Sequence, residues 1–288
     1  MTSADKQHLS GPASDTRRAP QKRLAVSFGS GGARALGSLG VMSVLRKHSI
    51  YPAAVSGASI GALIAAYYGV HGETETLRAW YETRKSYEYF SYLSKPNISI
   101  GLFGINRLKP LLASFVKHKS FEETSVPVRI IATNLRTGQQ HTFCSGPLIE
   151  AVMASIAVPG VMPAYRIKRE HYVDGAMTNP TPIDAFPPQA YDHHLAIDFH
   201  LHVPKRLPTP NVFETLIRSF QVATHSGFEY HLHRHRRNCT VITPNVSASV
   251  EFLRFDRAPF HIRAGVRAGH RLIRIWKEKG LYDQLRAG

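Results

Sequence analysis

Two short apolar segments near the beginning of the chain each run directly into a glycine-rich turn and then into an apolar stretch with helical spacing. The first segment, Leu24–Phe28, leads into Gly29-Ser30-Gly31-Gly32, and the second, Ala53–Ser56, leads into Gly57-Ala58-Ser59-Ile60-Gly61. Two strand–turn–helix units in succession are typical of a doubly wound α/β fold, whose functional site lies at the carboxyl ends of the strands. The sequence therefore predicts an α/β domain with a site at that edge of its sheet.

Further apolar runs supply the rest of the predicted core. Val128–Thr133, Leu195–Phe199 and Thr240–Ile242 are predicted to be strands, and Leu148–Ala157 is predicted to be a buried helix. The more polar and aromatic stretch 73–122 predicts helical insertions over the edge of the sheet. A chain of 288 residues is long enough to bury a full core without disulfides or metals.

The organisation of the chain is predicted from its changes in composition. Residues 1–22 are rich in Ser, Pro, Ala, Gln and mixed charge without periodicity, which predicts a disordered tail that is not a secretory signal. Residues 23–288 contain no repeat or linker and predict a single domain. The two cysteines, Cys144 and Cys239, are far apart and predict free thiols in a reducing cytoplasm. No apolar run approaches the length of about 20 residues that a membrane-spanning helix needs, so we expect no span.

The segment Gly57-Ala58-Ser59-Ile60-Gly61 matches the G-x-S-x-G pattern of a nucleophile elbow. A serine at such a turn has a strained backbone and raises its hydroxyl above the sheet. Gly57 and Gly61 lack the Cβ atoms that would collide in so sharp a turn. A plain strand–helix turn could show the same pattern, but the apolar strand before it and the apolar stretch Ala62–Tyr68 after it favour a nucleophilic Ser59.

The upstream turn Gly29-Ser30-Gly31-Gly32-Ala33-Arg34 also joins a strand to the start of a helix. Its small residues leave backbone N–H groups uncovered, and the start of a helix favours negative charge. One interpretation is a dinucleotide or phosphate loop, but G-x-G-x-x-G fails at Arg34 and no G-K-[ST] follows. The other is an oxyanion hole for acyl transfer, which a glycine loop upstream of an elbow serine favours.

An Asp-Gly pair, Asp174-Gly175, follows a strand-like segment that begins near His171. Asp-Gly is a strong hairpin signal, so a structural turn is one interpretation. The other is that the Asp174 carboxylate accepts the proton of Ser59. That role requires hydrogen-bond reach and a pKa raised by partial burial.

Taken in order, these segments resemble the active-site motifs of bacterial patatin-like phospholipases. The resemblance rests on a glycine-rich loop that ends in Arg (Ser30–Arg34), the G-x-S-x-G serine, and Asp174-Gly175-Ala176. It runs from about Leu24 to about Ile275. Three connecting segments are also similar to that family: Thr133–Gly138, Ala154–Pro163 and Asn179–Ile183.

The resemblance implies a three-layer α/β/α domain with a mostly parallel central sheet and a serine–aspartate dyad. Ser59 would attack an acyl ester and Asp174 would accept its proton, so that an acyl-enzyme forms. The expected oxyanion donors are the N–H groups of Gly31, Gly32 and Ala33. The residues expected to support the motifs are Arg34, Gly57, Gly61 and Gly175. The implied activity is hydrolysis of lipid acyl esters of the phospholipase A or lysophospholipase type, without a metal or organic cofactor.

Two residues of the glycine loop depart from the family pattern. Ser30 stands among the glycines, and Ala35 stands where a glycine usually follows the arginine. Ser30 is expected to be tolerated if its backbone does not need a positive φ. Ala35 places a methyl group near the start of the following helix, where it could alter the loop.

Two other functions remain open. An α/β-hydrolase with a Ser-His-Asp triad has the same order of loop and elbow, and His225 or His261 could be its histidine. A non-catalytic basic regulatory or binding protein would explain the charge, but it would leave the elbow and the loop unexplained. No nucleic-acid motif is present, so no nucleic-acid partner is expected. His231 and His235 stand at i, i+4, but neighbouring arginines and the lack of nearby Cys or carboxylate ligands argue against a metal site.

The formal net charge of +16 indicates an anionic partner. The part from about 205 to 288 has 15 Lys and Arg against 6 Asp and Glu, so it carries +9 of that charge. Within it, His261–Lys279 predicts a helix. Its apolar stripe is Ile262, Val266, Gly269, Ile273 and Trp276, and its basic stripe is Arg263, Arg267, His270 and Arg274. The helix is either docked with a solvated face or in peripheral contact with an anionic membrane, for which we expect the inner membrane surface.

Overall fold

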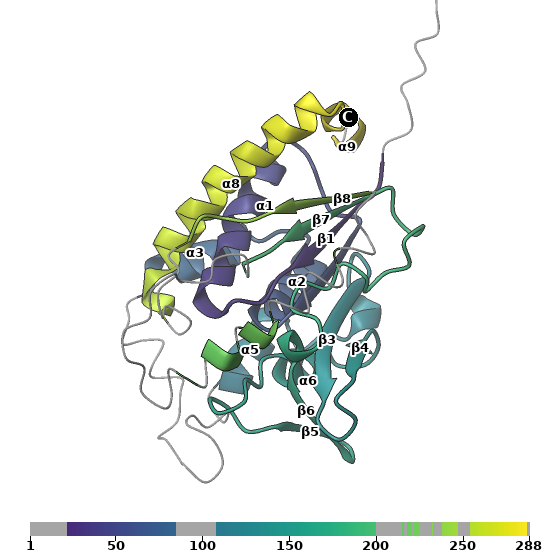
Figure 1. The fold of residues 1–288 in the computed structure, drawn as a ribbon, viewed down its shortest axis with the longest axis vertical. Helices are drawn as coiled ribbons and strands as arrows, with labels where there is room; N and C mark the ends of the chain where they lie inside the picture. Colours follow the sequence, from purple (N-terminus) through teal and green to yellow (C-terminus); the bar gives the residue numbers. More distant parts are fainter. Residues whose placement is uncertain are drawn as a thin grey trace, which may run out of the picture.

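A single eight-stranded sheet forms the centre of the molecule (Figure 1). The computed structural model describes residues 22–84, 108–199, 215, 218–220, 222–224, 232, 238–246 and 254–286. The strand order is β5-β6-β3-β2-β1-β7-β8, and β4 pairs with β3 outside this path. The parallel strands are β1 (Leu24–Phe28), β2 (Ala54–Ala58), β3 (Val128–Asn134), β7 (His193–Ile197) and β8 (Cys239–Ile242). The antiparallel strands are β4 (Gln140–Phe143), β5 (Tyr165–Ile167) and β6 (Glu170–Asp174).

The α/β class and the mostly parallel sheet are confirmed, and the strand bounds are corrected in detail. The strand predicted at Ala53–Ser56 continues to Ala58, and the one predicted at Leu195–Phe199 lies two residues earlier. The reason for the second error is that β7 begins with two buried histidines. His193 contacts the Thr240 hydroxyl at 2.8 Å, so a polar residue is accommodated in the core.

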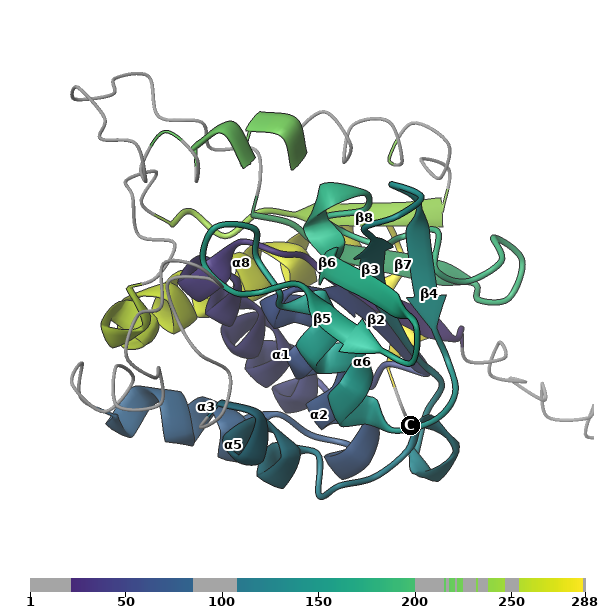
Figure 2. The ribbon, with the colours of Figure 1, turned by 90° about the horizontal axis from the view of Figure 1, so that it is seen from below.

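Helices of the described part of the chain cover one face of the sheet (Figure 2). They are α1 (Gly37–Lys47), α2 (Ile60–His71), α6 (Leu148–Ser155) and α8 (Ala258–Glu278). Leu24, Val26 and Phe28 of β1 belong to the main hydrophobic core under these helices. Helix α2 is buried along nearly its whole length, as its apolar sequence predicts.

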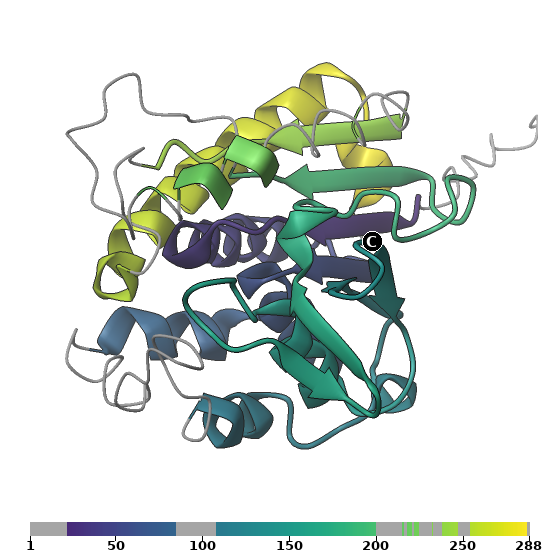
Figure 3. The same cartoon turned by 60° about the horizontal axis from the view of Figure 1, so that its bottom comes forward.

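The opposite face of the sheet is covered mainly by the chain that follows Asp174. Ser27 donates its hydroxyl to the Pro182 carbonyl at 3.0 Å, and Phe186 packs against Ala25 and Ala54. The small side chains on this face allow a loop to lie directly on the strands. The helical residues 218–220 and 222–224 also lie on this side of the sheet (Figure 3). Helices on both faces, as in a three-layer arrangement, agree with the prediction.

Helices α1 and α8 lie in very close contact because glycines face each other across their interface. A Cβ atom built on Gly265 would be 1.8 Å from the carbonyl oxygen of Gly37, and one on Gly40 would be 2.1 Å from that of Ile262. Both distances are far shorter than any real contact, so the backbones can approach this closely only without side chains. The apolar stripe predicted for α8 is therefore packed mainly against α1.

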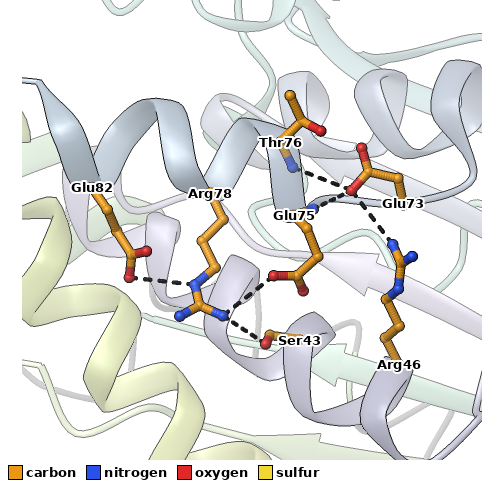
Figure 4. Close-up of polar contacts among 7 residues, drawn as sticks. All are labelled: Ser43, Arg46, Glu73, Glu75, Thr76, Arg78 and Glu82. Carbon is orange, nitrogen blue, oxygen red and sulfur yellow. Dashed lines mark hydrogen bonds and ion pairs between the residues drawn. The ribbon is translucent and has the colours of Figure 1, made fainter.

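Helix α3 (Glu75–Thr83) lies beside α1 and α8, and is joined to α1 by polar contacts (Figure 4). Arg78 donates to the Ser43 hydroxyl at 2.7 Å and also contacts Glu75 and Glu82 at 3.3 Å each. One turn further along α1, Arg46 forms an ion pair with Glu73 at 3.6 Å. Partly exposed ion pairs add little stability individually. The contacts of Arg78 with Ser43 and of Glu73 with Arg46 nevertheless join α3 and the residues before it to α1.

The described residues also form several shorter elements. They are α5 (Leu108–Phe115), α9 (Tyr282–Leu285) and the 3₁₀ helices η1 (Gly32–Leu36), η2 (Phe121–Glu123), η3 (Gly175–Met177) and η5 (Phe255–Arg257). Within the predicted insertions at 73–122, the described residues form α3, α5, the start of η2 and irregular turns. Helices α3 and α5 pack on the helical layer, and residues 85–107 lie outside the described residues. Among the described helices, none combines the length and apolar character needed to cross a membrane.

Candidate active site

Ser59 lies at the sharp turn between β2 and α2. Its backbone has φ 57° and ψ −129°, a conformation that L residues rarely adopt. A Cβ on Gly57 would be 2.1 Å from the carbonyl oxygen of Gly61, so a side chain there would collide with the first turn of α2. The strained, nearly buried serine and its flanking glycines agree with the predicted elbow geometry.

Strands β2 and β6 approach each other along one edge of β3 and bring two distant parts of the sequence together. Ala58, the last residue of β2, pairs with Ile131, and Asp174, the last residue of β6, pairs with Ala132. The opposite edge of β3 is occupied by β4 at both positions. Because β2 is parallel to β3 and β6 is antiparallel, their carboxyl ends meet, and Ser59 lies next to Asp174.

The Asp174 carboxyl group is completely buried. Oδ1 accepts the N–H of Ala176 at 2.8 Å, and Oδ2 has no hydrogen-bond partner among the described residues. Burial raises the pKa of Asp174 to about 7, while the Ser59 hydroxyl and the Ala176 N–H act in the opposite direction. The hydroxyl is thus near enough to influence the carboxylate, although the contact falls short of hydrogen-bond geometry. Such contacts often tighten only when substrate is bound.

The Asp-Gly pair begins the 3₁₀ helix η3 and is not a hairpin turn. A Cβ on Gly175 would be 2.0 Å from the carbonyl oxygen of Ile131, so only glycine allows the chain to pass this close to β3. The glycine therefore lets the chain turn against β3 directly after Asp174.

The glycine loop lies directly against the elbow. A Cβ on Gly61 would be 2.1 Å from the carbonyl oxygen of Phe28 and 2.8 Å from that of Gly29. The end of β1 and the first turn of α2 are therefore in backbone contact. This contact explains why Gly61 is required as well as Gly57, and it places the two predicted motifs side by side.

The conformation of the loop suits the presentation of N–H groups. Gly31 has φ 150° and Gly32 has φ 58°, both in the region that favours glycine. Ser30 donates its N–H to the Pro180 carbonyl at 2.8 Å. The first N–H groups of a helix such as η1 have no partner within it, and Gly32 and Ala33 begin η1. The groups predicted to be oxyanion donors, at Gly31, Gly32 and Ala33, thus lie in the loop next to the elbow.

Arg34 holds the loop together from inside. Its side chain is buried, and Nε donates to the carbonyl oxygen of Gly31 at 3.2 Å. Burial lowers the pKa of Arg34 to about 10, the negative charge of Asp198 opposes this change, and the charge of Arg218 adds to it. Arg34 is therefore still charged at neutral pH, with its guanidinium bonded to the loop backbone.

Both departures from the family pattern fit this geometry. Ser30 has no positive φ, so its side chain causes no strain, as expected. Ala35 lies inside η1, and its methyl group is completely buried in the main hydrophobic core. The methyl group is therefore accommodated below the loop.

Sequence reasoning missed the role of Ser155 at the end of α6. Its buried hydroxyl accepts the N–H of Ser59 at 2.9 Å and donates to the carbonyl of Ile131 at 2.5 Å. Two residues later, the Ala157 carbonyl accepts the N–H of Asp174 at 2.9 Å. The available signal was a single hydroxyl residue at the end of an otherwise apolar helical stretch, within the segment Ala154–Pro163 that resembles the family.

Of the two histidines considered as triad members, only His261 is among the described residues, and it does not lie beside Asp174. His261 is buried in α8, and its backbone lies close to Gly37. Burial, followed by the charges of Arg34 and Arg257, lowers the pKa of His261 to about 4. His225, His231 and His235 lie outside the described residues. Within the described ranges, no group of three or more His, Cys, Asp or Glu side chains is placed to hold a metal.

A serine on a strained strand-to-helix turn, beside a buried carboxylate and a glycine loop, is the arrangement used by serine hydrolases. Comparison with known families agrees with this class. The family model described as patatin-like phospholipase matches residues 26–187. The chain belongs to the patatin-like phospholipase family.

Several known proteins are similar to this chain. An NTE family protein of Mycobacterium tuberculosis is 28% identical over 169 residues, covering 58% of this chain and 46% of that protein. The neuropathy target esterase of Drosophila melanogaster is 24% identical over 182 residues, covering 61% of this chain and 13% of that protein. The chain thus spans about half the length of the mycobacterial relatives. The crystal structure of VipD from Legionella pneumophila aligns with 90% of this chain and 68% of its own, at 14% identity and a TM-score of 0.48.

Proposed function

We propose that the chain is a lipid acyl-ester hydrolase that acts through a dyad of Ser59 and Asp174. The observation that carries the proposal is the strained Ser59 backbone beside a buried Asp174 whose Oδ2 has no hydrogen-bond partner among the described residues. A carboxylate with a pKa of about 7 is well matched to accept a proton near neutral pH.

In the proposed reaction, Ser59 Oγ attacks the carbonyl carbon of the ester while its proton moves to Asp174. N–H groups of the glycine loop stabilise the negative oxygen of the tetrahedral intermediate. Asp174 then returns the proton to the leaving alcohol, and an acyl-serine remains. A water molecule, deprotonated in the same way, attacks the acyl-serine and releases the fatty acid, which restores Ser59.

For the substrate we propose a phospholipid or lysophospholipid, in a phospholipase A or lysophospholipase reaction. The family of the chain and the esterase name of the Drosophila relative support a lipid ester. We place the activity in the cytoplasm, at the inner membrane surface. The outer face of α8 supports contact with anionic lipid, because it exposes these basic residues: Arg263, Arg267, Arg271, Arg274, Lys277 and Lys279.

A triad hydrolase is the second candidate, and the same experiment separates the two. Ser59→Ala is expected to fold and to lose about a thousandfold or more of its ester hydrolysis, as removal of other catalytic serines does. Asp174→Asn is expected to remove most activity, whereas His225→Ala and His261→Ala should each leave it within a few-fold. The measurement is hydrolysis of a soluble ester together with labelling by a fluorophosphonate probe. Labelling of another serine, or a histidine variant as inactive as Asp174→Asn, would contradict the dyad.

A further inference from the structure

The hydroxyl of Ser155 is a fully buried polar group at the end of an apolar helix. A buried hydroxyl is costly unless it is hydrogen-bonded. Ser155 makes two hydrogen bonds, one with the Ser59 N–H and one with the Ile131 carbonyl. Its hydrogen is directed to Ile131 and one of its lone pairs receives the N–H. The orientation of the hydroxyl is therefore determined by both neighbours.

The Ser59 N–H is the group that connects the strained turn to the rest of the sheet. The paired part of β2 ends at Ala58, so the ladder with β3 does not reach Ser59. A backbone with φ 57° is strained and persists only where surrounding contacts hold it. Ser155 supplies such a contact, and through Ile131 it ties the turn to the residue of β3 that already pairs with Ala58.

The same short segment also holds the other member of the dyad. The Ala157 carbonyl accepts the Asp174 N–H at 2.9 Å, two residues after Ser155. The backbones of Ser59 and Asp174 are thus both attached to residues 155–157. A shift of this segment would change the separation between the serine and the carboxylate.

We propose that Ser155 is a positioning residue that holds the Ser59 turn in its reactive conformation. The inference rests on the proposed function of Ser59 and Asp174. It has a second consequence: the Ser59 N–H is engaged by Ser155 and is unavailable to a substrate oxygen. Stabilisation of the oxyanion is then left to the glycine loop.

The test compares Ser155→Ala with Ser155→Thr, which keeps the hydroxyl. With a short soluble ester, Ser155→Ala should lower kcat by about 10- to 100-fold, as expected for misplacement of a reacting group by about 1 Å, with KM changed by less than about twofold. The rate of fluorophosphonate labelling at Ser59 should fall in parallel. Ser155→Thr should restore both rates to within a few-fold of the original.

Ser27→Ala is the matched control, because Ser27 is also buried and its hydroxyl also accepts one hydrogen bond and donates another. It should lower the melting temperature about as much as Ser155→Ala and leave kcat within about twofold. If Ser155→Ala does not fold, Ser155→Cys replaces the hydroxyl with a weaker hydrogen-bonding group, and a loss of kcat is expected there too.

The outcomes separate this inference from the proposed function. If Ser59→Ala is inactive but Ser155→Ala, or Ser155→Cys, keeps its full kcat, the positioning role of Ser155 is overturned. The proposed dyad is not affected by that result. An active Ser59→Ala that is labelled at another serine overturns the proposed function, and the inference with it. Equal loss of kcat in Ser155→Ala and Ser27→Ala would show a general loss of stability and would also overturn the inference.

Discussion

Asp174 connects the pH of the solution to the proposed chemistry. Its pKa is raised to about 7 mainly by burial, which disfavours the charged form. A general base must be deprotonated to accept a proton, so the active fraction grows as the pH rises through the pKa. We expect kcat/KM for a soluble ester to increase about tenfold per pH unit below pH 7 and to level off above it.

The pH profile of kcat/KM between pH 5 and 9 measures this dependence, with the melting temperature followed at each pH to exclude unfolding. A histidine base with its ordinary pKa of about 6.5 could produce a similar curve, so His261→Ala is profiled in parallel. A profile that is flat from pH 5 to 8 would contradict the assignment of Asp174 as the base.

At the scale of residues, type and spacing in the sequence were enough to select the candidate groups that the structure places close together. Ser59, Asp174 and the loop glycines fall in short patterns whose chemistry depends on backbone shape. Ser155 could not be predicted in this way. Its two hydrogen-bond partners come from β2 and β3, so its role exists only after tertiary packing.

At the scale of elements, α1 and α8 pack so closely that glycines are required at their interface. Gly265→Ala would place a methyl group against the Gly37 carbonyl, which directly follows η1 and the glycine loop. We expect it to lower the free energy of unfolding by about 1–3 kcal/mol, as overpacking does. We also expect a several-fold loss of kcat, because Gly37 is the first residue of α1 and a shift of its carbonyl would also shift the glycine loop before it.

Gly269→Ala is the control for this prediction. It lies on the same helix, but its Cβ would meet the side chain of Val44 at 2.8 Å, and Val44 lies about two turns along α1 from Gly37. It should also destabilise the protein, as measured by thermal or denaturant unfolding, and leave kcat of the folded enzyme nearly unchanged. If both variants lose kcat equally, the loss in Gly265→Ala is not caused by displacement of Gly37 and the glycine loop.

The elements themselves were predictable to different degrees. The five parallel strands and helix α8 were predicted because their apolar runs or stripes match the period of the structure. Strands β4 and β5 were missed because they are short and their residues are mostly half-buried or exposed. The antiparallel pairing of β6 with β3, on which the position of Asp174 depends, is a property of topology that local patterns do not contain.

At the scale of the whole molecule, the positive charge is the property most open to test. We expect the protein to bind anionic vesicles more tightly than zwitterionic ones and to be released at high salt. Anionic membranes attract basic residues by about 1 kcal/mol each, and the Debye length falls from about 10 Å at 0.1 M to about 3 Å at 1 M salt. Replacing Arg263, Arg267 and Arg274 by Gln should weaken co-sedimentation without affecting hydrolysis of a soluble ester.

The arrangement of α8 restricts how such contact could occur. Ile262, Ile273 and Trp276 are buried, so the helix can offer lipid its arginines but not its main apolar residues. The matched control replaces Arg166, Lys168 and Arg169, exposed residues around the turn from β5 to β6, by Gln with the same change in charge. Equal loss of binding in both variants would mean that total charge decides. Equal binding to neutral and anionic vesicles would mean that the charge is incidental.

The contact between Gly37 and Gly265 also has a consequence for biosynthesis. The two residues are 228 positions apart (265 − 37), and ribosomes add about 5–20 residues per second, so on the order of tens of seconds separate their synthesis. During that interval a nascent chain already contains Ser59 and, later, Asp174, but the helix behind the glycine loop has no partner. The chain is therefore expected to become competent for hydrolysis only when α8 has emerged from the ribosome and packed against α1.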